Sequence, residues 1–135
     1  MNKTVFIFFA ILSGFSLYAQ NLTAKQVKDA AVSQKSAQES LEYVQSKLPE
    51  IQDKSERRAI YSFLGSLQEE LSMYKEAAAS YAVAAGIAGS DAAGMPKKSN
   101  QQLVIDAVRC SLNSGDWETA DGYLTSSVRN SKSSS

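Results

Sequence analysis

The chain has 135 residues, 44% of them hydrophobic and 21% charged, which fits one small globular domain and excludes an intrinsically disordered chain. Its 14 basic and 14 acidic side chains cancel, so no net field attracts nucleic acid or an anionic membrane, and we expect neither as a partner. Histidine is absent, which removes Ser-His and Cys-His nucleophiles and imidazole metal ligands. We therefore expect a protein that is not an enzyme and holds no metal or cofactor.

Residues 1–19 have the layout of a secretory signal peptide. Lys3 precedes an apolar run from Val5 to Leu12, and smaller residues then lead to Ala19. The run is shorter than the ~20 apolar residues of a membrane span, and no cysteine near Ala19 could carry a lipid. We expect cleavage after Ala19 and export to the periplasm, the cell envelope or the exterior, with no stable membrane anchor.

The remaining reactive groups are few. Cys110 is the only cysteine, so no disulfide can form within the chain, and we expect this thiol to be a small buried residue. Glu69 and Glu70 are adjacent and point to different sides of a helix, while a second acidic cluster, residues 116–121, marks a helix start. Neither pattern indicates a paired-carboxylate active site.

Helical periodicity begins at residue 23. Thr23 and Gln26 form a capping-box pair. Apolar or small residues then recur at helical spacing: Val27, Ala30, Ala31, Ala37, Leu41, Val44 and Leu48. Because residues 24–47 contain no glycine or proline, we expect one continuous or slightly bent helix ending before Pro49, with two short helices as the alternative.

Four more helices are predicted after it. Asp53 and Glu56 cap a helix over 54–71, and a break at Ser72 precedes an alanine-rich helix that begins at Tyr74 and is ended by Gly86 and Gly89. A glycine- and proline-containing loop over 89–98 leads to a helix beginning at Asn100. The fifth runs from Trp117 to about residue 128, and we expect residues 129–135 to be a disordered serine-rich tail.

The only tryptophan stands directly after a turn. Gly115 permits the chain to reverse and Asp116 caps the next helix. We expect Trp117, the first residue inside that helix, to lay its ring against the preceding helix pair.

Two segments of the chain align with each other. Tyr74 and Ala77 match Trp117 and Ala120, and Tyr81 then matches Leu124. These residues resemble the tetratricopeptide repeat (TPR), a helix-turn-helix unit. The first unit has Tyr61, Leu64, Gly65, Tyr74, Ala77, Tyr81 and Ala84 at pattern positions, and the second has Val104, Ala107, Gly115, Asp116, Trp117, Ala120 and Leu124.

The resemblance covers residues 58–128, with 23–49 as a possible degenerate unit. Gln68 departs from the expected tyrosine, Gly89 stands where proline is common, and Val108 replaces a small residue. The resemblance implies an all-α fold in which antiparallel helical hairpins, about five helices over residues 20–128, stack as a short solenoid. Two clear units are few for a self-sufficient solenoid, so an end needs a cover or the chain is a piece of a longer array.

The resemblance also implies a non-catalytic module that binds a protein or peptide on the inner surface, formed by the first helix of each unit. The candidate partner-binding residues are Phe63, Ser66, Glu70, Gln102, Ile105 and Arg109. This surface is mixed in sign and lacks the basic cluster that grips a peptide carboxylate. Ordinary helix surface or core remains an alternative for each residue. The alternative function is a small structural or inhibitor protein that forms a homo-oligomer through the alanine-rich face at residues 77–85.

Overall fold

The structure, a computed structural model, describes residues 22–89 and 91–133. The expected signal peptide, residues 1–19, lies outside them. The described residues form six α-helices and one 3₁₀ turn, so the prediction of an all-α chain is confirmed, with one helix more than expected. The elements are α2 (Ala24–Val32), α3 (Ala37–Lys47), η1 (Leu48–Glu50), α4 (Lys54–Glu70), α5 (Tyr74–Gly86), α6 (Asn100–Asn113) and α7 (Trp117–Ser133).

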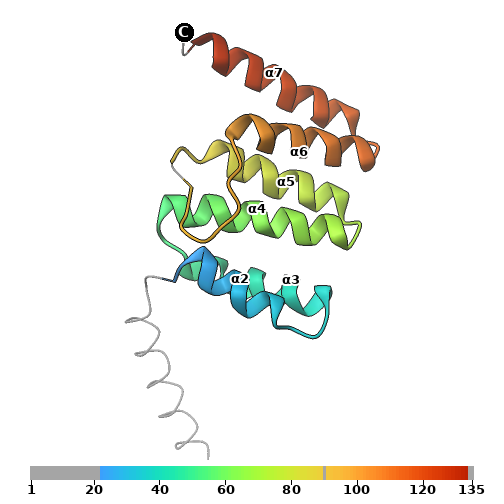
Figure 1. Cartoon of the computed structure of the whole chain (residues 1–135). Coiled ribbons are helices and arrows are strands. Elements are labelled where there is room, and N and C mark those ends of the chain that lie inside the picture. The colour runs from blue at the N-terminus through green and yellow to red at the C-terminus, as the bar shows by residue number, and fades with distance from the viewer. Residues whose placement is uncertain (1–21, 90, 134–135) are drawn as a thin grey trace, which may run out of the picture.

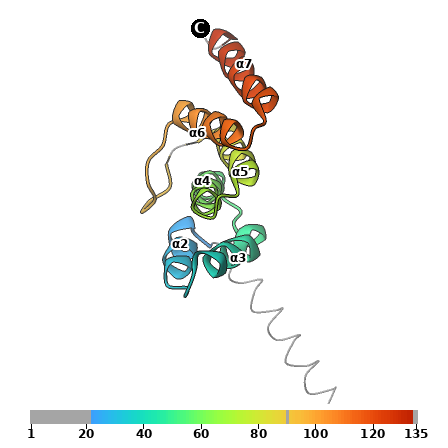
Figure 2. The ribbon, with the colours of Figure 1, turned by 90° about the vertical axis from the view of Figure 1, so that its right-hand side faces the viewer.

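The helices follow one another through space in chain order. Figure 1 shows α2 and α3 at one end, then α4, α5 and α6, and α7 at the other end. The side view shows α2 and α3 next to each other below α4, while the connection between α5 and α6 descends along one flank (Figure 2). None of the helices in the described part of the chain is both long enough and apolar enough to span a membrane.

The predicted helix starts are confirmed by their caps. Thr23 and Gln26 form the reciprocal capping box at the start of α2. The Asp53 side chain accepts from the Glu56 amide at the start of α4, and that of Asp116 accepts from the Thr119 amide in the first turn of α7. These bonds satisfy amides that have no partner within their helix, which fixes where α2, α4 and α7 begin.

The preference for one helix over residues 23–48 is wrong, because the chain turns back between α2 and α3. The Ser33 hydroxyl and the Gln34 side-chain amide both donate to the Ala30 carbonyl, at 2.7 and 3.1 Å, and Ser36 caps α3. Polar side chains thus take over backbone bonds that a continuing helix would need. The reversal lets both short helices bury their apolar faces on α4.

Two apolar clusters fill the interior. The N-terminal core joins α2, α3 and α4 with the 87–99 loop; its large members are Val27, Leu41, Val44, Ile51, Ile60, Leu64, Leu67 and Met95. The C-terminal core lies between α5 and α6; its members are Ala77, Ala78, Tyr81, Ala84, Leu103, Ala107 and Cys110. The prediction that Cys110 is buried is confirmed.

Tyr81 joins α5 to α4 through Gly65. A Cβ atom on Gly65 would lie 2.9 Å from the Tyr81 ring, which is itself 1% exposed. The missing side chain therefore makes room for the ring, and α4 and α5 approach closely. A small and a large residue that the TPR resemblance placed in one unit thus interlock here.

The expected packing of Trp117 is wrong, since its side chain is 73% exposed. Gly115, with a φ of 81°, and the Asp116 cap form the predicted turn, but α7 directs Ala120 inward. Trp117 shares its side of α7 with Leu124, which is also exposed. The helix also continues to Ser133, so residues 129–133 are helical and not the disordered tail that was expected.

Candidate interaction surface

The three candidates on α4 do not form one exposed group. Phe63 is half-buried and packs on the N-terminal core. Ser66 is exposed, and its hydroxyl donates to the Phe63 carbonyl of its own helix at 2.7 Å. Glu70 is the exposed last residue of α4. Only Ser66 and Glu70 are therefore open to a partner.

The three candidates on α6 lie on one side of that helix. Gln102, Ile105 and Arg109 are all exposed and are spaced three and four residues apart. Leu112 continues the row, and it was missed by sequence reasoning although it follows Ile105 at a helical spacing. We call these four residues the α6 face. Ile105 and Leu112 expose 48% and 54% of their surface, on either side of Arg109.

Arg109 is fixed by carboxylates from two helices. Its guanidinium pairs with both carboxylate oxygens of Glu69 on α4 and with Asp106 on α6, the latter at 3.1 Å. The Tyr81 hydroxyl donates to Glu69 at 2.7 Å. Sequence reasoning named Arg109 for this surface, and the structure adds that it forms an ion pair with Glu69.

Asp106 extends this group to the 87–99 loop. The Lys98 ammonium lies 2.7 Å from Asp106 and 4.8 Å from the centre of the Tyr81 ring. Gln102 donates to the same carboxylate at 3.0 Å. We call Glu69, Tyr81, Lys98, Asp106 and Arg109 the charge cluster. It ties α4, α5, α6 and the loop together behind the α6 face.

The charge cluster holds its groups in their ordinary charge states. The hydrogen bond from Arg109, helped by the one from Tyr81 and opposed by burial, lowers the Glu69 pKa from 4.5 to about 2. Burial opposes ionisation of Asp106, but hydrogen bonds from Lys98, Gln102 and Arg109 outweigh it and lower that pKa. Burial, and then Glu69, raise the Tyr81 pKa. None of these three groups exchanges a proton near neutral pH, so the cluster supplies fixed charge and hydrogen bonds.

The buried thiol is also unreactive. Burial raises the Cys110 pKa from 9.0 to about 11, and nearby Glu69 raises it further while Arg109 opposes the rise. The protonated thiol is a poor nucleophile. Within residues 22–89 and 91–133, no group of three or more acidic or cysteine side chains is arranged to hold a metal ion.

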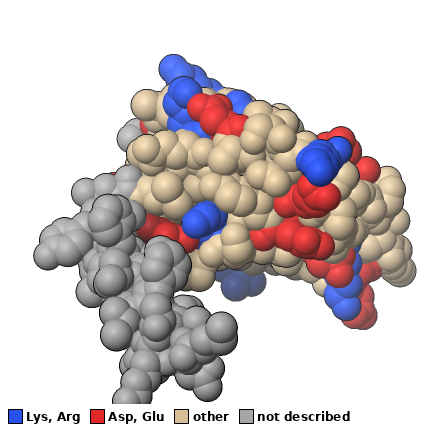
Figure 3. Space-filling model, turned by 90° about the horizontal axis from the view of Figure 1, so that it is seen from below, with Lys and Arg blue, Asp and Glu red and all other residues tan. Residues whose placement is uncertain are grey.

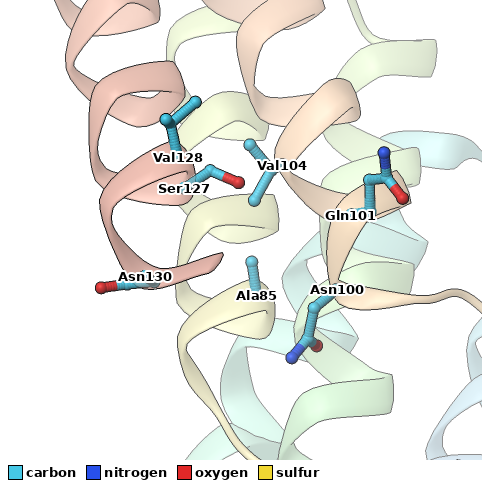
Figure 4. Close-up of a pocket in the computed structure, with 7 residues that line it drawn as sticks. All are labelled: Ala85, Asn100, Gln101, Val104, Ser127, Val128 and Asn130. Atoms are coloured by element: carbon cyan, nitrogen blue, oxygen red, sulfur yellow. The ribbon is translucent and has the colours of Figure 1, made fainter. Parts of the chain in front are cut away.

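A hollow of about 600 Å³ separates the C-terminal half of α7 from α5 and α6. Figure 4 shows Val104 and Ser127 facing across it, with Ala85 below them. Amides of Asn100, Gln101 and Asn130 also line it. This lining of small apolar groups and neutral amides carries no charged group that would select an ionic ligand.

The charged side chains visible from below are mixed. Figure 3 shows basic and acidic groups beside one another, separated by uncharged surface. The described residues visible on this face form no continuous basic patch of the kind that follows a nucleic-acid backbone.

Comparison of the chain with protein-family models, with curated proteins and with solved structures finds no match.

Proposed function

We propose that this chain is an exported, non-catalytic protein–protein interaction module of the bacterial envelope or exterior, which binds a protein or peptide partner on the α6 face. One observation carries the proposal: Ile105 and Leu112 are about half exposed on either side of an arginine that other residues hold in place. Arginine is enriched among the few residues that supply most of the affinity of an interface, and neighbouring contacts exclude water from such residues.

The charge cluster prepares this surface for binding. Arg109 bonds to Glu69 and Asp106 before any partner arrives, so little side-chain freedom is lost when a partner docks. The same carboxylates neutralise the guanidinium. The α6 face therefore suits an apolar side chain with neutral hydrogen-bonding groups beside it, and a free peptide carboxylate is a poor match.

We further propose a TPR-like arrangement of the helix pairs. The close contact of Gly65 with Tyr81 and the antiparallel packing of α4 with α5 support the first unit. The second unit has its predicted turn at Gly115, but its aromatic residue, Trp117, is exposed. The TPR-like proposal thus rests on α4 and α5 more than on α6 and α7.

The alternative of a homo-oligomer through the alanine-rich face at residues 77–85 has less support. Ala77, Ala78 and Ala84 are buried between α5 and its neighbours. In the same segment Ala79 and Val83 are exposed, and a structural or inhibitor role would have to use these residues or a different face.

Affinity capture from native envelope, with chemical cross-linking, tests the proposed function. We expect one specific protein to be retained by the wild-type chain and lost with Ile105→Asp. Val32→Asp is the matched control, because Val32 is a 63% exposed apolar residue at the opposite end. Capture that is equal for both variants, or absent for the wild type, would contradict the proposal.

A further inference from the structure

One side of α7, beside the side that faces α6, carries a row of large exposed apolar side chains, of which Val128 also borders the hollow between α7 and α6. Trp117, Leu124 and Val128 are 73%, 47% and 53% exposed. Their spacing of seven and four residues places them on one side of the helix, next to the side on which Ala120 faces inward. We call these three residues the α7 row. Asp121 lies between Trp117 and Leu124 on the same side, so one exposed carboxylate interrupts the apolar row in its N-terminal half.

The two halves of α7 carry opposite charges beside and within the α7 row. Glu118 and Asp121 lie in the N-terminal half of α7, while Arg129 and Lys132 lie in the C-terminal half, and all four are exposed. This polarity is the one that a helix dipole favours. It also makes the surface complementary to itself when two copies run in opposite directions.

We propose that α7 pairs with α7 of a second copy of this chain, antiparallel, about a two-fold axis near Leu124 and Thr125. Glu118 of one copy then lies near Lys132 of the other, and Trp117 lies about one helical turn from Val128 of the other. A parallel pair would place each charge beside its like, which disfavours that arrangement. The acidic half of the row likewise disfavours an anionic lipid surface, which binds helices with basic flanks.

The size of the surface sets the expected strength. One pair of single helices buries less area than a standard protein interface, so the contact belongs to the weak, exchanging class. We expect a dimer with a dissociation constant in about the micromolar range, driven by the α7 row and aligned by its flanking charges. The α6 face plays no part in this contact, so the pairing stands apart from the proposed function.

Sedimentation equilibrium on the chain, expressed from its full sequence, tests the proposal. We expect a monomer–dimer equilibrium. Leu124→Glu should raise the dimer dissociation constant at least about tenfold, because it places two carboxylates at the two-fold axis. Leu124 is half exposed, so this change spares the core, which circular dichroism will verify. Val32→Glu and Ile105→Glu are controls that should leave the equilibrium within about twofold.

Two further measurements make the test specific. Because Trp117 is the only tryptophan, its emission should shift to shorter wavelength across the same concentration range. Glu118→Lys should weaken pairing, and Glu118→Lys with Lys132→Glu should restore it, since the two charges meet only in the antiparallel arrangement. A monomer at every concentration, association indifferent to Leu124→Glu, constant emission, or no rescue by the double reversal would overturn the proposal.

Discussion

The two ends of the molecule differ in how far their apolar side chains are buried. At the N-terminal end, the reversal between α2 and α3 places Val27, Leu41 and Val44 in the N-terminal core, and each is at most 2% exposed. At the other end, α7 turns Trp117 and Leu124 to solvent. Of the exposed large apolar residues in the described chain, only Val32 belongs to the first three helices; the others are Val83, Ile105, Leu112, Trp117, Leu124 and Val128.

This difference follows from what each end packs with. Two short helices with aliphatic faces can close over α4, because their reversal brings both faces onto it. Alpha-7 meets α6 mainly through Ala120 and Tyr123, which are small or only partly buried. The C-terminal end therefore leaves apolar surface exposed for contacts between chains. At the N-terminal end the apolar surface is buried and stabilises the fold.

The largest expected effect comes from a matched pair of truncations. Ile60→Ala empties a fully buried site in the N-terminal core and should lower the free energy of unfolding by about 2–5 kcal/mol. Trp117→Ala removes a larger side chain from an exposed site and should change it by less than about 0.5 kcal/mol at protein concentrations where the chain is monomeric. Urea denaturation followed by circular dichroism measures both. Comparable losses for the two variants would refute the contrast between the ends.

Two glycine substitutions test the close contact between α4 and α5, one at that contact and one in α7 as a control. Gly65→Ala places a methyl group 2.9 Å from the Tyr81 ring and should destabilise the protein by about 1–3 kcal/mol, despite the better helix propensity of alanine. Gly122→Ala meets no atom within 4 Å in α7 and should stabilise it by up to about 1 kcal/mol. Thermal unfolding distinguishes the two signs. A stabilising Gly65→Ala would show that the ring does not lie against that glycine.

The ion pair between α4 and α6 gives a pH-dependent effect. The folded-state pKa of Glu69, about 2, lies below its ordinary value of 4.5, so its contribution to stability is complete above about pH 4.5 and disappears as the pH falls toward 2. The difference in stability between the wild type and Glu69→Gln should therefore shrink across that window.

Urea titrations at a series of pH values measure this difference. Glu70→Gln is the matched control, because it removes the exposed neighbouring carboxylate without touching Arg109, and we expect it to follow the wild type. A Glu69→Gln penalty that stays constant down to pH 2 would exclude the charge cluster as its source.

The smallest effect concerns a buried hydroxyl in α6. Ser111 is 1% exposed, and its side-chain oxygen has no hydrogen-bond partner among the described residues. Ser111→Ala should therefore be neutral or slightly stabilising, within about 1 kcal/mol, because no bond is lost. A loss greater than this in the same urea assay would reveal a bond that Ser111 makes in solution.

Sequence reasoning worked where local chemistry decides the structure. The caps at Thr23, Asp53 and Asp116 and the turn at Gly115 were predictable, because each depends on residues within one turn of helix. Gly65 and Tyr81, which are in contact between α4 and α5, were both named among the pattern positions of the first TPR-like unit.

It failed where partners far along the chain decide. The break after Val32 carries no glycine or proline. The bonds from Ser33 and Gln34 to Ala30 are local, but the burial of both short helices against α4 is not, and it favours the reversal. The exposure of Trp117 depends on the rotation of α7 about its own axis where it packs on α6. Periodicity alone does not determine this rotation, because both Ala120 and Trp117 are acceptable on the buried side of a helix. At the candidate surface, the row on α6 was predictable, whereas the pairing of Arg109 with Glu69 required the tertiary structure.

The accessibility of the single tryptophan tests the open C-terminal end most directly. Acrylamide quenching of Trp117 fluorescence, in dilute solution where the chain is monomeric, compares the folded protein with the same protein in urea. We predict nearly equal quenching constants in the two states, because the folded ring is 73% exposed. Strong protection of the ring in the dilute folded protein would contradict the account, because it would mean that α7 buries the surface we assign to contacts between chains.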